Sequence, residues 1–361
     1  MRILVVLSII LIWFFSLVND SGLGHLYHTS EKMNYMILMW SVYLSLFKGR
    51  SFIPKLGVLR TLLLILFFML FPFVISGKWE GATYLVSFLT IYCFSNINIS
   101  VKELSCSAFA IGFLGLGLIT IYARTEILSG WNDNTIAMLT LFSFIYFSIF
   151  FNTVKKKSIR YLCWLMAITY IIQISGTDSR GSLLFMLLAV VMMYAHKSTN
   201  NIISNSKIRT FVIYFPLIIA IIVVWIASQS WFRDLNSWSL LNSGKPVFNG
   251  RDELWAYTFE NILDYPFGRG RFFLNYHNSV VACIGVFGIV GCVIWCNFFI
   301  RQLTVATKYF GDYIVYACVC AFILIYMQQS IELGFISPTP NMMPYMILGL
   351  GLGRVRWHER K

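Results

Sequence analysis

The sequence predicts an all-α polytopic membrane protein, a single integral membrane domain over residues 1–361 with about twelve transmembrane helices. Three observations lead to this prediction: the composition, the recurrence of apolar segments and the distribution of charge. Hydrophobic residues make up 58% of the chain and charged residues only 12%, whereas about a quarter of a soluble domain is charged. With a mean hydropathy of +0.73, the composition excludes a soluble enzyme, a nucleic-acid-binding domain and a disordered chain.

Apolar segments recur along the whole chain, and a transmembrane helix needs about 20 mostly apolar residues. The predicted spans are 3–18, 33–47, 61–76, 82–98, 104–123, 136–152, 161–174, 183–196, 210–228, 277–300, 309–330 and 341–353. Residues 1–18 could instead be a cleaved signal peptide. They lack a small-x-small cleavage site and further spans follow them, which favours a retained helix.

Charge is distributed unequally between the loops on the two sides. One side carries 19 of the 28 basic residues and three of the 15 acids, a balance of +16. The other side carries nine basic and twelve acidic residues, a balance of −3. Because cytoplasmic loops are enriched in Lys and Arg, the first side is predicted to be cytoplasmic, and it holds both termini. The net charge of +13 is therefore a topology signal and not a nucleic-acid-binding footprint.

One loop on the outer side, about 229–276, is long. Loops of more than about 12–15 residues are uncommon unless they are functional or disordered. This loop contains Trp231, Trp238 and Trp255, which favours a folded cap or interfacial helices. Residues 252–263 have weakly amphipathic helical spacing and could lie along the membrane surface.

Polar residues gather at further places on the outer side. Between two spans lies a turn from Ser175 to Ser182, in which Arg180 either snorkels or pairs with Asp178, or binds an anionic headgroup. A guanidinium group suits phosphate because it donates paired hydrogen bonds and stays charged. Three more arginines follow in the long loop at positions 251, 269 and 271. Acids in the same loop could neutralise them, or they could form an anion site.

The tenth span begins with His277 and Asn278. A histidine at a helix start is a cap or interface residue, or, next to an arginine-rich loop, a possible base. Glycines at 285, 288 and 291 follow at a spacing of three, which predicts a groove for close approach of another helix.

These motifs, in this order, resemble the bacterial superfamily of O-antigen polymerases and O-antigen ligases, which are polytopic inner-membrane glycosyltransferases. The resemblance covers about 175–291, including the loop 229–276. The matching residues are Ser179-Arg180-Gly181, Gly250-Arg251 with Trp255, Pro266-Phe267-Gly268-x-Gly270, His277-Asn278 and Gly288-x-x-Gly291. The chain departs from the family pattern at Arg269, where an apolar residue is usual, and at Cys292-Val293, where ligases have small hydroxyl residues. The second departure favours a polymerase.

The resemblance implies an enzyme that uses undecaprenyl-pyrophosphate-linked oligosaccharides at the periplasmic face. Arg180 and Arg251 would bind the pyrophosphate, and His277 would orient or deprotonate the acceptor hydroxyl. We expect these three as catalytic residues and Arg269, Arg271, Asn278 and Asp178 as substrate-binding residues. No metal and no cofactor are expected, since the chain has no P-loop, no Rossmann glycine pattern, no suitable carboxylate pair and no metal-ligand spacing among its eight cysteines.

Three functions follow from this reading as alternatives. The first is an O-antigen polymerase that joins lipid-linked repeat units, with a separate chain-length determinant protein as a possible partner. The second is an O-antigen ligase that transfers the glycan to lipid A–core. The third, of another class, is a flippase for lipid-linked oligosaccharides, although such transporters tend to have two related halves and polar residues at the midplane.

Overall fold

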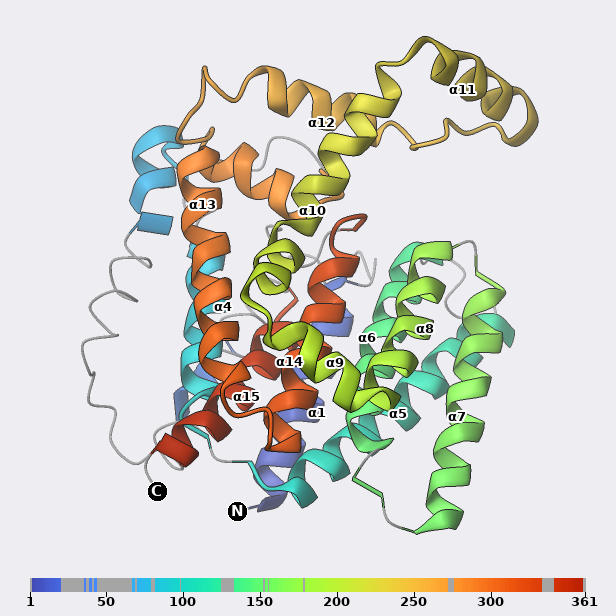
Figure 1. Cartoon of the computed structure of the whole chain (residues 1–361), viewed down its shortest axis with the longest axis vertical. Coiled ribbons are helices and arrows are strands. Elements are labelled where there is room, and N and C mark those ends of the chain that lie inside the picture. Colours follow the sequence, from blue (N-terminus) through green and yellow to red (C-terminus); the bar gives the residue numbers. More distant parts are fainter. Residues whose placement is uncertain are drawn as a thin grey trace.

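The computed structural model describes residues 2–20, 36, 39–40, 42–43, 67–68, 70–78, 82–97, 99–124, 133–151, 153–154, 156–177, 179–271, 276–332 and 341–359. In these parts of the chain, all regular secondary structure is helical (Figure 1). The helices are α1 (Arg2–Asp20), α4 (Ala82–Phe94), α5 (Val101–Arg124), α6 (Asp133–Phe151), α7 (Lys157–Ser175), α8 (Arg180–Tyr194), α9 (His196–Ser204), α10 (Ser206–Ala227), α11 (Ser230–Ser243), α12 (Arg251–Glu260), α13 (Ser279–Thr307), α14 (Tyr313–Gln328) and α15 (Met343–Glu359).

Ten of the twelve predicted spans coincide with a described helix. Of the other two, 61–76 is described as helical at residues 67–68 and 70–76, and 33–47 lies largely outside the described residues. By length and composition, four helices could each cross a membrane: α5, α7, α10 and α13. The pair α8 and α9 could form a fifth span, bent by 103° at the break between the two helices. The described residues thus form a helical structure with four or five candidate membrane spans, while the count of twelve spans stays a prediction.

The helices divide into buried and peripheral sets. Along α14, residues 314–326 are at most 1% exposed, and α6, α13 and α15 are also largely buried. By contrast, α7 and α10 expose large apolar side chains such as Ile172 and Trp225. Exposed apolar surface of this extent is expected where a helix faces lipid.

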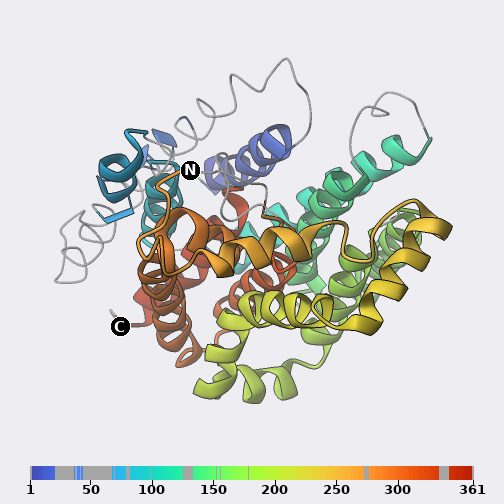
Figure 2. The same ribbon diagram turned by 90° about the horizontal axis from the view of Figure 1, so that it is seen from above.

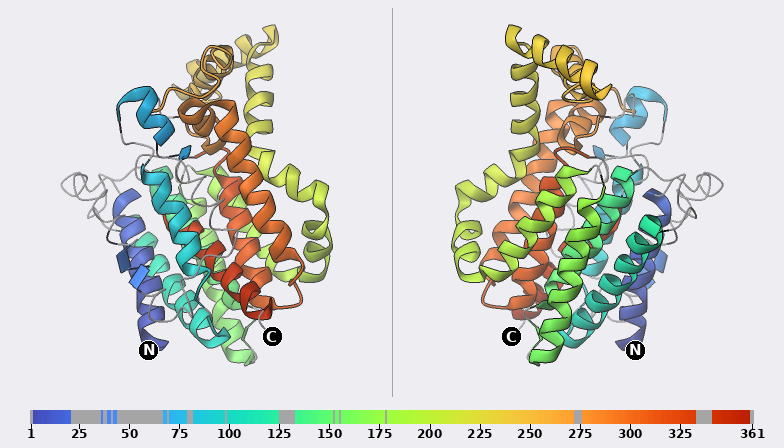
Figure 3. Two further views of the ribbon diagram at one scale, coloured as in Figure 1. Left: turned by 90° about the vertical axis from the view of Figure 1, so that its left-hand side faces the viewer. Right: turned by 90° about the vertical axis from the view of Figure 1, so that its right-hand side faces the viewer.

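The start of α1 and the end of α15 lie at one end of the bundle, and α11 and α12 lie at the opposite end, which we call the distal end (Figures 1 and 3). Seen from above, α12 lies across this end (Figure 2). The described part of the long loop 229–276 is therefore a folded cap, and the helix predicted over 252–263 is α12. An even number of membrane crossings is compatible with this arrangement of the ends.

Near its start, α13 is interrupted at Gly288, whose backbone adopts φ 69° and ψ −176°. Residues with side chains hardly occupy this region. The interruption leaves the carbonyls of Gly285 and Val286 available, and they accept hydrogen bonds from the backbone N–H groups of Arg269 (3.0 Å) and Gly270 (2.9 Å). The spacing of the glycines predicted a groove for a neighbouring helix, whereas the structure has a docking site for the preceding loop.

The loop and the break approach closely from both sides. A Cβ at Gly288 would overlap the Pro266 carbonyl, and a Cβ at Gly268 would overlap the Val286 carbonyl. The two glycines therefore depend on each other: each leaves the space that the other's backbone occupies. Irregular backbone within a membrane protein is tolerated where the protein itself buries it, as it does at Gly288.

At the end opposite the cap, one carboxylate joins α14 to α15. Asp312 Oδ1 accepts a hydrogen bond from the Ile314 N–H (2.9 Å) and so caps α14. Its Oδ2 lies 2.5 Å from Arg354 Nε and 2.7 Å from His358 Nε2. Asp312 thus combines a helix cap with two interactions to another helix.

Asp312→Ala should lower the free energy of unfolding by about 2 to 4 kcal/mol, because it removes the cap and leaves two partly buried donors without their acceptor. Thermal unfolding in detergent measures the effect. Glu359→Ala is the matched control, since Glu359 is an exposed acid at the same end of the bundle. Equal unfolding temperatures for the two variants would contradict a stabilising role of Asp312 as helix cap and link to α15.

Candidate functional site

Two of the predicted catalytic residues meet at one carboxylate at the distal end. Arg251 Nη2 lies 3.3 Å from Glu332 Oε1, and His277 Nδ1 lies 3.5 Å from Glu332 Oε2. The Glu332 side chain is only 15% exposed, whereas His277 is partly open to the surface. The carboxylate therefore bridges an arginine and a histidine from two separate sequence motifs.

Arg251 is held by the turn that precedes it. Asn249 (φ 55°) and Gly250 (φ 77°) both adopt left-handed backbone conformations, and Arg251 follows as the first residue of α12. One turn later, the buried Trp255 donates a hydrogen bond from Nε1 to the Tyr276 carbonyl (2.5 Å). Trp255 thereby ties the helix that carries Arg251 to the residue directly before His277.

His277 is held by the residue that follows it. His277 has φ 46°, an uncommon value for a residue with a side chain. The Asn278 side chain accepts hydrogen bonds from the N–H groups of Val280 and Val281 and donates to the carbonyls of Pro216 (2.8 Å) and Ser330 (3.0 Å). We predicted Asn278 as a substrate-binding residue; in the structure its side chain is fully buried and its amide bonds within the protein.

The same contacts explain why Glu332 lies beside His277. The end of α14 is joined to the start of α13 by Asn278 and by a hydrogen bond from the Ser279 N–H to the Gln329 carbonyl (3.0 Å). Residues 330–332 continue from this point toward the surface. Glu332 is not among the residues that the motifs select; the available signal was an acid two residues after a polar run, Gln328 to Ser330, at the outward end of a predicted span.

The start of α8 lies next to this group through a contact of Gly181. Gly181 packs so closely against Ile331 that a Cβ at 181 would overlap the isoleucine side chain. Arg180 is the first residue of α8, and its side chain is exposed. The start of α8 therefore adjoins the residue before Glu332. Asp178, the predicted alternative partner of Arg180 and a predicted substrate-binding residue, lies outside the described residues.

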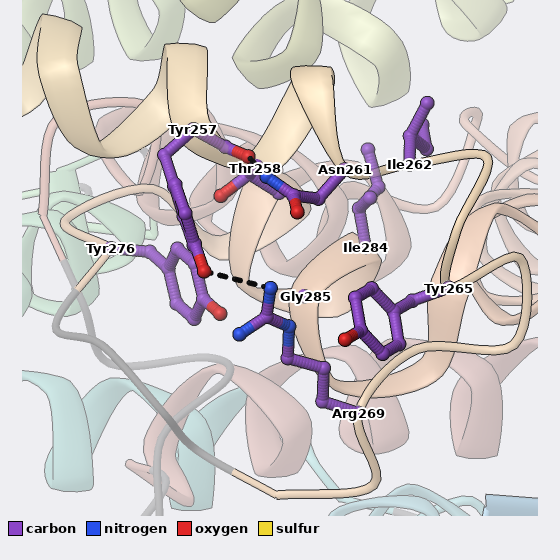
Figure 4. A pocket seen from close by; sticks show the side chains of 9 residues that line it. All are labelled: Tyr257, Thr258, Asn261, Ile262, Tyr265, Arg269, Tyr276, Ile284 and Gly285. Atoms are coloured by element: carbon purple, nitrogen blue, oxygen red, sulfur yellow. Dashed lines mark hydrogen bonds between the residues drawn. The ribbon is translucent and has the colours of Figure 1, made fainter.

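Arg269 occupies a separate aromatic cage (Figure 4). Its guanidinium carbon lies 4.5 Å from the ring centre of Tyr265 and 5.1 Å from that of Tyr257, and Nη2 donates to the Tyr257 hydroxyl (2.9 Å). The cage encloses a cavity of about 20 Å³, room for about one water molecule. Within it, burial raises the pKa of the Tyr276 hydroxyl, and the charge of Arg269 partly offsets this rise.

These contacts give Arg269 a structural role: they attach the loop that docks on α13 to the C-terminal part of α12. Arg271 is exposed at the end of the described loop segment. Five predicted site residues remain beyond Arg251 and His277, and the structure describes four of them: Arg180 begins the helix whose start adjoins the Glu332 group, Arg269 and Asn278 have structural contacts, and Arg271 lies at the surface. The fifth, Asp178, is not described.

No family model, curated protein or solved structure matches this chain. Any assignment of function therefore depends on the chemistry of the residues themselves.

The Glu332 group combines an anion-binding donor with a possible proton acceptor. The Arg251 side chain is partly exposed, and its buried Nε has no acceptor among the described residues, so protein contacts do not saturate the guanidinium. His277 turns Nδ1 toward Glu332, which leaves Nε2 as the nitrogen that a bound hydroxyl could reach. Among the described residues, no three His, Cys, Asp or Glu side chains gather as metal ligands.

Proposed function

We propose that this protein is an O-antigen polymerase, a metal-independent glycosyltransferase that joins undecaprenyl-pyrophosphate-linked repeat units at the periplasmic face of the inner membrane. The observation that carries the proposal is the group at Glu332: Arg251 and His277, which the family resemblance selects as catalytic, share one carboxylate at the distal end. The neighbouring start of α8 adds Arg180.

In the proposed reaction, a hydroxyl on the non-reducing sugar of a new lipid-linked repeat unit attacks the anomeric carbon of the growing glycan. A carbon–oxygen bond forms to the acceptor, and the bond from the anomeric carbon to the pyrophosphate oxygen breaks. Negative charge develops on the leaving lipid pyrophosphate, so Arg251 and Arg180 stabilise the transition state more than the ground state. No nucleotide sugar is needed, because the lipid pyrophosphate bond already activates the donor.

His277 would accept the proton of the attacking hydroxyl, and Glu332 would orient the imidazole and stabilise the imidazolium that forms. Because Glu332 also holds Arg251, it fixes the distance between the base and the anion-binding group. Glu332 is thus a positioning residue in this proposal.

The glycan ladder of a deletion strain tests the proposal against its two alternatives. Loss of a polymerase leaves lipid A–core that carries a single repeat unit, and the chain expressed from a plasmid restores the ladder. Bare core with unused lipid-linked glycan would indicate a ligase instead. Lipid-linked repeat units retained on the cytoplasmic side would indicate a flippase, and either result would overturn the proposal.

Glu332→Gln should reduce the rate of chain elongation by about 10²-fold at unchanged membrane levels, because it keeps the shape of the side chain but removes the charge that supports the imidazolium. The distribution of glycan lengths measures the loss. Glu253→Gln is the matched control, since Glu253 is an exposed acid on α12. Long chains in both variants would contradict the positioning role.

Arg180→Lys retains the positive charge but loses the paired donors of the guanidinium, so chain elongation should fall severely. This result separates the two interpretations of Arg180, since a snorkelling side chain tolerates lysine. A normal ladder in Arg180→Lys would favour snorkelling.

A further inference from the structure

The helix α11 carries an apolar face that no described part of the protein covers. Trp231, Leu235 and Trp238 follow one another at spacings of four and three residues and therefore share one side of the helix. Their exposures are 55%, 42% and 63%. We call these three residues the Trp face. A soluble surface seldom exposes two tryptophans and a leucine side by side.

The other side of α11 packs against its own loop. Phe232 is buried and stacks on Phe248, with ring centres 4.9 Å apart and an interplanar angle of 12°. Asn236 Oδ1 accepts a hydrogen bond from the Val247 N–H (2.9 Å). These contacts fix the rotation of α11, so the Trp face is directed away from the segment that leads to Arg251.

The position of α11 in the chain indicates what covers the Trp face. The preceding helix, α10, is 22 residues long with a mean hydropathy of 2.7, and only 22% of it is buried inside the protein. Its last turns expose Ile222 and Trp225, apolar side chains that suit contact with lipid. Only Ser228 and Gln229 separate α10 from α11, so α11 starts directly at the end of this candidate span.

We propose that α11 is an interfacial helix whose Trp face inserts into the boundary between headgroups and acyl chains of the distal leaflet. Tryptophan is enriched at this boundary because its ring is apolar and its N–H can still bond to water or headgroups. The partner is the phospholipid bilayer, and helices with one apolar face bind it in this orientation.

The proposal has a consequence for the functional site. Through the Phe232–Phe248 stack, α11 is joined to the turn that ends at Arg251, so the anchored helix sets the depth of that guanidinium relative to the headgroups. A lipid pyrophosphate lies at this depth. This consequence rests on the proposed function, whereas the membrane contact of α11 does not.

Cysteine accessibility tests the membrane contact without any measurement of activity. The chain is reconstituted in phosphatidylcholine nanodiscs that hold one copy each and treated with a membrane-impermeant maleimide. Trp238→Cys tests the Trp face, and Ser237→Cys, an exposed position on another side of α11, is the matched control. The unsubstituted chain gives the background; seven of its eight cysteines are not exposed and Cys106 is.

We expect the thiol at 238 to react about tenfold more slowly than the thiol at 237, since a rise of about one unit in thiol pKa in apolar surroundings leaves tenfold less thiolate. Dissolving the disc in a detergent of short chain length removes the bilayer and should therefore reduce the difference in reaction rate between the thiols at 238 and 237. A second variant, Leu235→Cys, should react as slowly as Trp238→Cys. Because it keeps both tryptophans, it shows whether the slow reaction at 238 results from the loss of Trp238 itself. Equal reactivity at all three positions in single-copy discs would overturn the proposal, and protection only in crowded vesicles would indicate contact with a second chain instead.

Discussion

Arg251→Ala should abolish long glycan chains while the protein remains at its normal level in the membrane. The Arg251 guanidinium has one nitrogen 3.3 Å from Glu332 and a buried Nε that no described acceptor faces. A pyrophosphate oxygen bound at the exposed part of this guanidinium would gain a charge-assisted hydrogen bond as charge develops on the leaving group. Removing one such donor costs about 10²–10³ in rate, enough to leave only short chains.

The control for this prediction is Arg233→Ala, because Arg233 is an exposed arginine on α11, in the same cap. Its ladder should be normal. A double variant separates the pyrophosphate role from a structural one. If Arg251 acted only through Glu332, Arg251→Ala would cause no further loss in a Glu332→Gln background. We expect the double variant to elongate about 10²-fold more slowly than Glu332→Gln alone; equal rates for the two, or long chains in Arg251→Ala alone, would contradict the proposed role.

Gly288→Ala should cause the largest loss of folded protein among the substitutions considered. The φ of 69° and ψ of −176° cost a residue with a side chain about 1–3 kcal/mol, and the new Cβ would overlap the Pro266 carbonyl. Relieving that overlap would separate the loop from α13 and break the two hydrogen bonds to Gly285 and Val286, each of about 1 kcal/mol. The total expected loss is about 3 to 5 kcal/mol.

Thermal unfolding in detergent measures this loss, with Gly117→Ala as the matched control. Gly117 is a helical glycine in α5 whose Cβ would enter open space, so alanine should leave stability unchanged or raise it slightly. The unfolding temperature of Gly288→Ala should lie well below that of the control. Similar temperatures would show that the loop tolerates a Cβ at the break.

The helices were predictable from the sequence because apolar runs of span length are a strong and local signal. Ten predicted spans coincide with helices for this reason. The number of membrane crossings is less evident, since α14 and the apolar stretch Ile136–Phe151 of α6 are short and buried within the bundle. An apolar run indicates burial, and it does not distinguish burial in protein from burial in lipid.

The candidate site was predictable in part. Arg251 and His277 were singled out because charged and titratable groups at a membrane edge are costly. Their meeting at Glu332 was not predictable, since it depends on how the end of α14 packs against the start of α13. The cap that Asn278 forms had a local signal, since an asparagine directly before an apolar run is a typical helix cap.

The break in α13 was missed for a different reason. Glycines at a spacing of three suit both a helix–helix contact and an interruption of the helix, and sequence spacing does not separate them. Only the loop that docks at Gly288 decides between the two. The same docking explains why Arg269 lies among tyrosines rather than beside Arg251.

The most direct test of the proposed function is a reaction with purified components. The chain in proteoliposomes is supplied with undecaprenyl-pyrophosphate-linked repeat units and a metal chelator, without any nucleotide sugar. We expect lipid-linked glycans of two and more repeat units to appear together with free undecaprenyl pyrophosphate, and Arg251→Ala to form neither. Absence of elongation by folded wild-type protein, or transfer only when lipid A–core is added, would contradict the assignment as a polymerase.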